Sequence, residues 1–210
     1  MERAAMRVKD VGDTAFAVDF DDGDRVVALY DAIRRVGPLL GLVETVPSLR
    51  SLLVIFDPLS ISRAEMEARI RGLADRASDG DGGEGRSWRI PVRYDGPDLD
   101  AVAQACGLSR TRVIDLHAGR VYQVRMLGFM PGFAYMGTLP EALRLGRRGE
   151  PRLKVPAGSV AIADDMTAIY PWESPGGWHL LGSAEIALFD QTREPPALLA
   201  AGDQVVFVPL

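Results

Sequence analysis

The segment between positions 144 and 154 concentrates positive charge in a chain that is acidic overall. It contains Arg144, Arg147, Arg148, Arg152 and Lys154, which are five cations within eleven residues. A guanidinium group donates two parallel hydrogen bonds to a carboxylate or a phosphate, and an ammonium group holds either one as a point charge. The segment therefore indicates recognition of an oxyanion, and a solvated surface loop is the alternative interpretation.

Three segments rich in glycine, proline and aromatic residues surround or overlap these cations. They read GFMPGFAYMG over residues 128–137, PRLKVPAGSVAIA over residues 151–163 and IYPWESPGGWHLLG over residues 169–182. Loops of this composition let backbone N–H groups approach a ligand closely, and aromatic side chains can form the walls of a pocket. The segments favour a site for a small anion, with a barrel core and its turns as the alternative.

Two side chains in the third segment have types suited to acid–base catalysis. His179 can act as a general base near neutral pH, or it can be a strand histidine at the rim of a barrel. Glu173 can orient a water molecule or a ligand amine. His117 precedes Gly119 at the end of an expected helix, where a charge complement to the helix dipole is the better interpretation. Ser159 has small neighbours as in a nucleophile elbow, but the residues after it predict a strand, whereas an elbow leads into a helix.

The composition conflicts with several functional classes. The formal net charge of −5 disfavours general binding to a nucleic-acid backbone. A nucleotide-binding loop of the G-x-x-x-x-G-K-[ST] type requires lysine after glycine, but Lys9 follows Val8 and Lys154 follows Leu153. Cys106 is the only cysteine, so with two histidines the chain forms neither an intrachain disulfide nor a four-ligand Cys/His zinc site. The N-terminus has no signal-like apolar segment, and we expect a cytoplasmic protein that does not enter a membrane.

The first third of the chain predicts a small α/β domain. Alternating apolar residues over residues 14–20 indicate a strand, and residues 52–56 indicate a second, buried strand. Asp24 is the expected cap of a first helix. Ser62 and Glu65 form a capping box at the start of a second helix. Strands with two helices on one face make an α/β sandwich, for which a ferredoxin-like arrangement is one candidate.

Residues 78–87 mark a boundary between two domains. The sequence SDGDGGEGRS at these positions has four glycines, four charged residues and no apolar side chain, which is typical of a flexible linker. The predicted domains are residues 1–77 and 88–210. In the second domain, Asp98 and Ser109 are expected to cap two short helices. Short strands separated by glycine and proline then indicate a β-barrel, so the fold class is α+β. The predicted strands of this domain cover residues 88–94, 121–127, 159–163, 167–170, 178–181, 185–189 and 204–208.

The three glycine-rich and aromatic segments resemble the signature segments of one protein family. That family includes the B subunit of 5-oxoprolinase, the sporulation-kinase inhibitor of spore-forming bacteria and one module of urea amidolyase, and it is often labelled allophanate hydrolase subunit 1. Weaker similarity extends to IPVRYDGPDLDAVA, to residues 117–122 and to AGDQVVFVPL, and in the first domain to VPSLRSLLVIFDP. The resemblance implies a small α/β domain followed by a cyclophilin-like barrel.

The resemblance also implies an activity and partners. A B subunit is expected to act with a second cyclophilin-like subunit, the C subunit of such an enzyme, in the ATP-driven opening of 5-oxoproline to glutamate, while a third subunit completes the hydrolysis. ATP with Mg²⁺ is expected at the level of the complex. A non-catalytic inhibitor of a histidine kinase and a component of a urea or allophanate amidase are the alternatives. The expected catalytic residues are His179 and Glu173, and the expected ligand-binding residues are Phe129, Pro131, Gly132, Phe133, Tyr135, Arg147, Arg152, Pro156, Gly158, Ser159, Tyr170, Ser174, Gly176, Gly177 and Trp178.

The chain departs from the family pattern at two places beside the expected pocket. A glycine-bearing loop is expected where residues 164–168 stand, and an Arg-Thr pair is expected at Ser183 and Ala184. These positions bear on the substrate and on whether the chain catalyses the family reaction.

Overall fold

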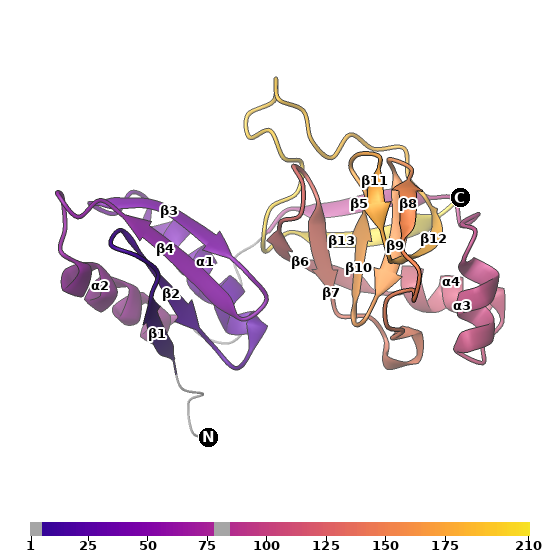
Figure 1. Ribbon diagram of the computed structural model, residues 1–210, viewed down its shortest axis with the longest axis horizontal. Coiled ribbons are helices and arrows are strands. Elements are labelled where there is room, and N and C mark those ends of the chain that lie inside the picture. The colour runs from indigo at the N-terminus through magenta and orange to yellow at the C-terminus, as the bar shows by residue number, and fades with distance from the viewer. Residues whose placement is uncertain (1–5, 78–84) are drawn as a thin grey trace. The chain divides into compact units, whose positions relative to one another are not determined.

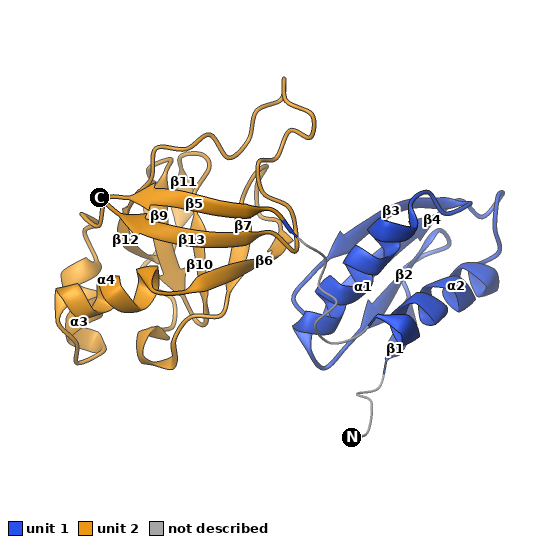
Figure 2. Cartoon of the chain, turned by 180° about the vertical axis from the view of Figure 1, so that it is seen from behind, with its two compact units in different colours: residues 1–85 blue, residues 86–210 orange. Residues whose placement is uncertain are grey.

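The computed structural model describes residues 6–77 and 85–210 of the chain. The chain divides into two compact units, residues 1–85 and 86–210 (Figure 2). Most of the predicted linker, residues 78–84, lies outside the described residues. Each unit has an apolar core of its own.

The first unit is a four-stranded antiparallel sheet with two helices on one face. Its elements are β1 (Arg7–Asp10), β2 (Ala15–Asp19), α1 (Gly23–Val36), β3 (Leu42–Pro47), β4 (Ser51–Phe56) and α2 (Arg63–Arg76). The strands lie in the order β1-β2-β4-β3, and both helices lie in front of the sheet in Figure 2. Successive strand residues point to opposite faces, so Phe16, Val18, Leu52 and Val54 are all fully buried in the core that the helices cover.

The order of elements in this unit is ββαββα. A ferredoxin-like arrangement has the order βαββαβ. The strand that would follow α2 in that arrangement is replaced by β1, which pairs antiparallel with β2 at the edge of the sheet. The predicted α/β sandwich is therefore confirmed, with a different order of elements.

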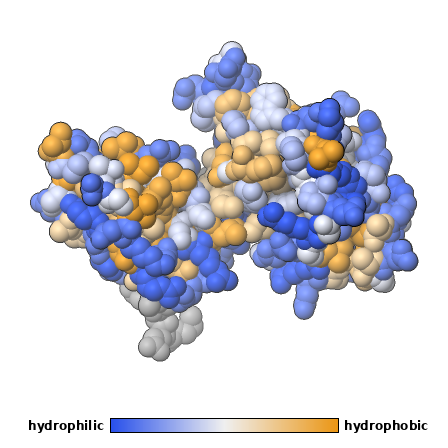
Figure 3. Space-filling view, viewed as in Figure 1, coloured by the Kyte–Doolittle hydropathy of each residue, from blue (hydrophilic) through white to orange (hydrophobic). Residues whose placement is uncertain are grey.

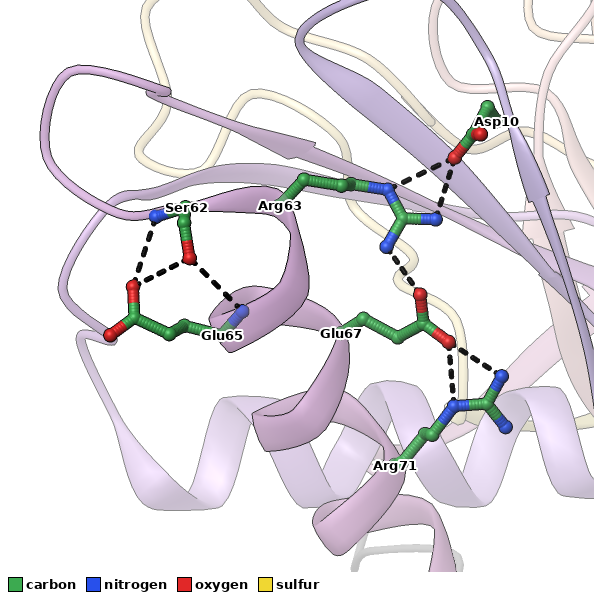
Figure 4. Close-up of polar contacts among 6 residues, drawn as sticks. All are labelled: Asp10, Ser62, Arg63, Glu65, Glu67 and Arg71. Atoms are coloured by element: carbon green, nitrogen blue, oxygen red, sulfur yellow. Dashed lines mark hydrogen bonds and ion pairs between the residues drawn. The ribbon is translucent and has the colours of Figure 1, made fainter.

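The two helices of this unit begin with side-chain caps. Ser62 accepts from the Glu65 N–H while the Glu65 carboxylate accepts from the Ser62 N–H, so the predicted capping box is confirmed (Figure 4). The predicted cap of α1 is wrong, because Asp22 rather than Asp24 holds the N-cap position and accepts from the Asp24 N–H. Asp24 lies in the first helical turn, where its charge complements the helix dipole.

A chain of ion pairs joins α2 to β1. Arg63 bonds to Asp10 of β1 and to Glu67 one turn along α2, and Glu67 also bonds to Arg71 (Figure 4). The Arg63 guanidinium lies over the Phe16 ring, with 4.0 Å between its Cζ atom and the ring centroid. Ion pairs at a solvated surface stabilise a fold only weakly, so these contacts chiefly orient α2 on the sheet.

The sheet face opposite the helices is open within this unit. Figure 3 shows apolar side chains gathered over β3 and β4 on that face. Leu53 of β4 lies between Ala17 of β2 and Val46 of β3, and both Leu53 and Ile55 are only partly buried. An antiparallel sheet with a single covered face shows this alternation, although its open face is usually more polar.

The second unit is a nearly closed barrel with two short helices at one end (Figure 1). Its elements are β5 (Ser87–Val92), α3 (Leu99–Ala105), α4 (Arg110–Ala118), β6 (Val121–Leu127), β7 (Ala134–Gly137), the 3₁₀ turn η1 (Glu141–Leu143), β8 (Arg152–Val155), β9 (Ser159–Ala163), β10 (Met166–Ile169), β11 (Ser174–Gly176), β12 (His179–Ser183) and β13 (Gln204–Pro209). Seven strands form one sheet in the order β12-β9-β10-β7-β6-β13-β5. The ends of that sheet meet where Arg93 and Ser183 exchange backbone hydrogen bonds of 2.9 and 2.8 Å. The predicted barrel is therefore confirmed.

The barrel interior contains a fully buried histidine, His117, at the end of α4. Thr167 donates to the Ala161 carbonyl at 3.0 Å, so its Oγ1 accepts from the His117 Nε2–H at 2.9 Å, and His117 Nδ1 accepts from the Tyr94 hydroxyl at 2.7 Å. Burial lowers the pKa of His117 to about 3. The prediction of a charged complement to the helix dipole is wrong, because this ring is neutral and enclosed by the core.

The predicted strands of the barrel agree with the structure except at one place. Residues 185–189 were expected to form a strand, but they belong to the long loop between β12 and β13, drawn in yellow in Figure 1. In that loop the Leu198 N–H donates to the Leu188 carbonyl at 2.8 Å, and the preceding Pro195 and Pro196 have no N–H to extend the pairing. In contrast, no strand was expected at the positions of β7, β8 and β11, which form within the three glycine-rich and aromatic segments.

Candidate functional site

Asp98 is the centre of a buried polar cluster in the second unit. The sequence predicts it as a helix cap, but its side chain makes no capping hydrogen bond to α3. The residue is 3% exposed. Its carboxylate accepts from Arg148 Nη1 at 2.7 Å, from Arg152 Nη2 at 2.6 Å and from the Leu180 N–H at 2.7 Å. Asp98 does hold the predicted N-cap position, but its side chain does not cap the helix, because donors from distant parts of the chain occupy this carboxylate.

Two guanidinium groups share one carboxylate in this cluster. Both arginines bond to Asp98 Oδ1, and the Leu180 N–H bonds to Oδ2. Burial opposes ionisation of the carboxyl, but the hydrogen bonds from Arg152 and from the Leu180 N–H outweigh it, and the pKa of Asp98 lies below its ordinary value. The carboxylate is thus ionised and compensates only one of the two guanidinium charges.

Both guanidinium groups also keep donors that the protein does not use. Within the described part of the chain, Arg148 Nε and Arg152 Nη1 are buried and meet no acceptor. The side chains are nevertheless partly open to solvent, with relative exposures of 31% for Arg148 and 24% for Arg152. A buried donor without an acceptor costs about 1–3 kcal/mol. The cluster is therefore complementary to an anion.

The loop that carries Arg147 and Arg148 is held against the third glycine-rich and aromatic segment. The Arg148 N–H donates to the Gly177 carbonyl at 2.8 Å, and His179 Nε2 lies 3.0 Å from the Gly146 carbonyl oxygen. A carbonyl oxygen only accepts, so Nε2 carries a proton and Nδ1 is the nitrogen of the neutral ring that can accept another. The structure thus brings Gly177 and His179 together with the arginine loop.

Four aromatic side chains pack into a small second core on the outer side of the barrel sheet. The Phe133 ring centroid lies 4.8 Å from that of Tyr135, 5.2 Å from that of Tyr170 and 5.9 Å from that of Trp178. Burial raises the pKa of both tyrosines, and the nearby Arg147 charge opposes the rise. The rings therefore form an apolar surface close to Arg147. The sequence allowed these aromatic residues to be either core or the wall of a pocket, and this arrangement agrees partly with both interpretations.

One glycine permits close packing against this aromatic core, and the glycine after it lies next to the arginine loop. A Cβ atom on Gly176 would collide with the Tyr170 hydroxyl, which also accepts from the Trp178 N–H. A Cβ atom on Gly177 would lie 4.0 Å from the Arg147 Cβ atom. The packing against Tyr170 thus requires glycine at position 176, whereas position 177 has room for a Cβ atom.

A second group of expected residues lies on the surface. Phe129 is 63% exposed and has a positive φ of 68°, which is uncommon for a residue other than glycine. Trp172 is 49% exposed, and its indole N–H donates to the Pro131 carbonyl at 3.1 Å. Gly132 has a φ of 81°, and a Cβ atom there would lie 2.8 Å from the Phe189 Cβ atom. These residues form an aromatic surface loop.

A third group forms the turn between β8 and β9. Gly158 has a φ of 81°, and a Cβ atom there would lie 2.5 Å from the Ala184 carbonyl oxygen. The Ser159 N–H donates to the Pro156 carbonyl at 3.3 Å, and Ser159 itself is buried at the start of β9. A strand rather than a helix follows Ser159, so it has no nucleophile-elbow geometry.

Glu173 and Ser174 lie where β11 begins. Glu173 forms a 3.0 Å ion pair with Lys154, and the two side chains are 58% and 77% exposed. Such a pair is solvated and weak. Ser174 Oγ is buried and has no hydrogen-bond partner among the residues that the structure describes. The two neighbours therefore face different surroundings, with Glu173 in water.

The structure shows a cavity away from the arginine cluster. It has a volume of about 250 Å³, lies at the seam of the barrel and is lined by Pro91, Arg93, Ser183, Glu185 and Leu210. Ser183 belongs to one of the two places at which the chain departs from the family pattern. Within residues 6–77 and 85–210, no group of three His, Cys, Asp or Glu side chains is placed to hold a metal ion. In the same residues no helix has the length and apolar character needed to span a membrane.

The sequence did not identify Asp98 or the Leu180 N–H as members of the site, and it named Arg148 only as one of five clustered cations. Asp98 stands in IPVRYDGPDLDAVA, so the weaker family resemblance was a signal for it. An aspartate before a short helix is adequately explained as a cap, and that local explanation concealed its long-range bonds.

Comparisons with known proteins agree on one family. A family model described as carboxyltransferase domain, subdomain C and D, matches residues 6–199. The B subunit of 5-oxoprolinase from Escherichia coli O157:H7 is 40% identical over 206 residues, which cover 95% of this chain and 94% of that protein. The B subunit of 5-oxoprolinase from Bacillus subtilis strain 168 is 36% identical over 224 residues, which cover 96% of this chain and 92% of that protein.

A solved structure extends the comparison to the fold. The crystal structure of TTHA0988 superimposes with a TM-score of 0.80 and 39% identity, and the match covers 97% of this chain but 40% of that protein. The chain thus spans less than half of TTHA0988 and nearly all of the two 5-oxoprolinase relatives. By the extent of these matches, which include both units, the chain belongs to the family of 5-oxoprolinase B subunits.

Proposed function

We propose that this chain is the B subunit of an ATP-dependent 5-oxoprolinase, which opens 5-oxoproline to L-glutamate in the cytoplasm. The observation that carries the proposal is the 40% identity to a 5-oxoprolinase B subunit over 95% of this chain and 94% of that protein. A match of this extent involves both units of the chain. It therefore supports a shared role more strongly than a likeness between single barrels would.

The proposal includes a second cyclophilin-like subunit, the C subunit of the enzyme, and a third, hydrolytic subunit. Support for a second polypeptide comes from TTHA0988, because this chain accounts for 40% of that protein and the remainder is additional sequence. A function that one long chain performs can be divided between separate subunits. This chain alone is then expected to be inactive.

Opening a lactam requires activation, because an amide carbonyl resists attack by water at neutral pH. When ATP is bound in the complex, it supplies a phosphoryl group for that activation. Arg148 and Arg152 suit the anionic groups involved, because they have one uncompensated charge and two donors without acceptors among the described residues. Mg²⁺ is proposed to accompany ATP at the level of the complex.

We assign the role of general base in this chain to His179. Its Nε2 atom is bonded to the Gly146 carbonyl at 3.0 Å, which leaves Nδ1 to accept a proton from the attacking water. Glu173 is left out of this assignment, because its side chain is 58% exposed and is ion-paired with Lys154.

Deletion of the gene tests the proposal in the organism. The deletion strain should accumulate 5-oxoproline, and a plasmid copy of the gene should restore the normal level. An unchanged level of 5-oxoproline would contradict the proposal. If the deletion instead impaired growth on urea, the amidase alternative would be favoured.

A further inference from the structure

Asp98 holds the two arginines of the cluster in fixed directions. Its Oδ1 atom lies 2.7 Å from Arg148 Nη1 and 2.6 Å from Arg152 Nη2, while its Oδ2 atom accepts from the Leu180 N–H at 2.7 Å. The residue is 3% exposed, so rotation of its side chain would break buried hydrogen bonds. The arginines are therefore ordered before any ligand arrives, which reduces the entropy cost of binding.

This cluster has more positive charge than negative charge, and more hydrogen-bond donors than acceptors. Asp98 compensates one guanidinium charge out of two, and Arg147 adds a further cation on the same loop. Arg148 Nε and Arg152 Nη1 are buried and without acceptors in the described structure, while 31% and 24% of the two side chains remain exposed. An oxyanion with two or more acceptor oxygens at the exposed part of these side chains would offset the uncompensated charge.

An apolar surface adjoins these charges. The Arg147 charge acts to lower the pKa of both Tyr135 and Tyr170. These two tyrosines pack with Phe133 and Trp178 in one aromatic cluster. A ligand that joins an anionic group to a small apolar ring would find partners for both of its parts. Pockets that combine a few charged donors with aromatic walls are typical of small-molecule sites.

We propose that Arg148 and Arg152 bind a carboxylate or phosphate group, and that Asp98 is the positioning residue of this oxyanion site. The identity of the ligand rests on the proposed function, in which the group is either the carboxylate of 5-oxoproline or a phosphate of the nucleotide. The two sources share the same recognition chemistry, since both present oxygen atoms to a guanidinium fork.

Binding measurements without turnover test the site. Inorganic phosphate, 5-oxoproline and ATP are titrated separately into the purified chain and into the co-purified complex, with calorimetry for affinity and ¹⁵N NMR of the arginine Nε–H groups for contact. We expect saturable binding and shifts of the Arg148 and Arg152 signals. Arg148→Gln and Arg152→Gln should each weaken binding about tenfold to a hundredfold. Arg112→Gln, an exposed residue of α4, is the matched control and should bind as the unmodified chain does.

The Asp98→Asn variant separates positioning from simple charge. The substitution removes a negative charge, so electrostatics alone would make anion binding tighter. If Asp98 positions the arginines, binding weakens by about tenfold or more in a variant that still folds. Tighter or unchanged binding would overturn the role of Asp98.

The outcomes distinguish the ligand sources and the two proposals. Binding of 5-oxoproline alone supports the substrate carboxylate, and binding of phosphate and ATP alone supports the nucleotide. If no oxyanion binds to the chain or the complex, or if the Arg148 and Arg152 variants bind like the Arg112 control, the site is overturned. A complex that binds 5-oxoproline through these arginines but never forms glutamate contradicts the proposed function and supports the site.

Discussion

Mild acid should destabilise the second unit, because His117 is fully buried there as a neutral ring. The Tyr94 hydroxyl donates to His117 Nδ1 and Thr167 Oγ1 accepts from its Nε2–H, so both nitrogens are satisfied in the neutral form only. A proton on Nδ1 would face a donor hydroxyl. Burial lowers the pKa of His117 to about 3, whereas an unfolded histidine has a pKa of about 6.5.

The sign of the effect follows from proton binding. Between the two pKa values the unfolded chain binds more protons at His117 than the folded chain does. The stabilising contribution is complete above pH 6.5, roughly, and is lost as the pH falls toward the folded pKa of about 3. Each pH unit below 6.5 costs about 1.4 kcal/mol, so a change from pH 7.5 to about 5 should lower the free energy of unfolding by about 2 kcal/mol.

Urea denaturation followed by tryptophan fluorescence measures this change, because Trp88, Trp172 and Trp178 all lie in the second unit. The test variant is His117→Phe, which keeps an aromatic ring against Phe207, whose centroid lies 4.7 Å from that of His117. The variant leaves the Tyr94 hydroxyl without its acceptor, at a cost of about 1–3 kcal/mol at every pH. His179→Gln is the matched control, because it removes the other histidine of the chain.

Carboxylates titrate in the unmodified chain and in both variants. A comparison of the three therefore isolates the contribution of His117 to the pH dependence of the free energy of unfolding. The loss of stability on acidification should be smaller by about 2 kcal/mol in His117→Phe than in the unmodified chain or in His179→Gln. An equal pH dependence in all three would refute the reasoning.

Three further predictions concern other single positions. Ser62→Ala removes the cap of α2 and should lower the free energy of unfolding of the first unit by about 1 kcal/mol, measured by circular dichroism in urea. Gly158→Ala places a Cβ atom 2.5 Å from the Ala184 carbonyl oxygen at a φ of 81°, and should destabilise the second unit by about 1–3 kcal/mol. Gly146→Ala, which meets nothing within 4 Å, is its control and should leave the urea midpoint nearly unchanged. His179→Asn should lower kcat of the assembled enzyme about a hundredfold or more at an unchanged urea midpoint, and an unchanged kcat would exclude His179 as the base.

Features determined by neighbouring residues were predictable from the sequence. The capping box of Ser62 and Glu65 depends on hydrogen bonds that span three positions, and it is present as predicted. The alternation over residues 14–20 correctly placed Phe16 and Val18 in the core. Six of the nine strands of the second unit were recognised for the same reason, since turns and strand composition are local properties.

Features determined by distant residues were not predictable from local pattern. Asp98 bonds to donors 50, 54 and 82 positions away, so its sequence neighbours indicated only a helix cap. His117 bonds to Tyr94 and Thr167, which are 23 and 50 positions away, and its place at a helix end indicated a surface charge. In both cases the fold supplies partners that outweigh the local preference.

The proline pair before Leu198 shows a different limit. The alternating residues 185–189 have strand composition, but their partner segment contains Pro195 and Pro196, which lack the N–H groups of a ladder. A strand requires a partner as well as a suitable composition. The strand prediction for residues 185–189 was therefore wrong because of the partner segment, and the residue pattern of one segment gives no information about its partner.

The most direct test of the central claim is an ATP-dependent assay of glutamate formation from 5-oxoproline. The chain is co-expressed and co-purified with the products of the adjacent reading frames, and glutamate is measured with and without ATP. We expect glutamate only when ATP, 5-oxoproline and this chain are all present, with a lower rate for Arg152→Gln and an unchanged rate for Arg112→Gln. An assembled complex that forms no glutamate, or that forms it equally well without this chain, would contradict the account.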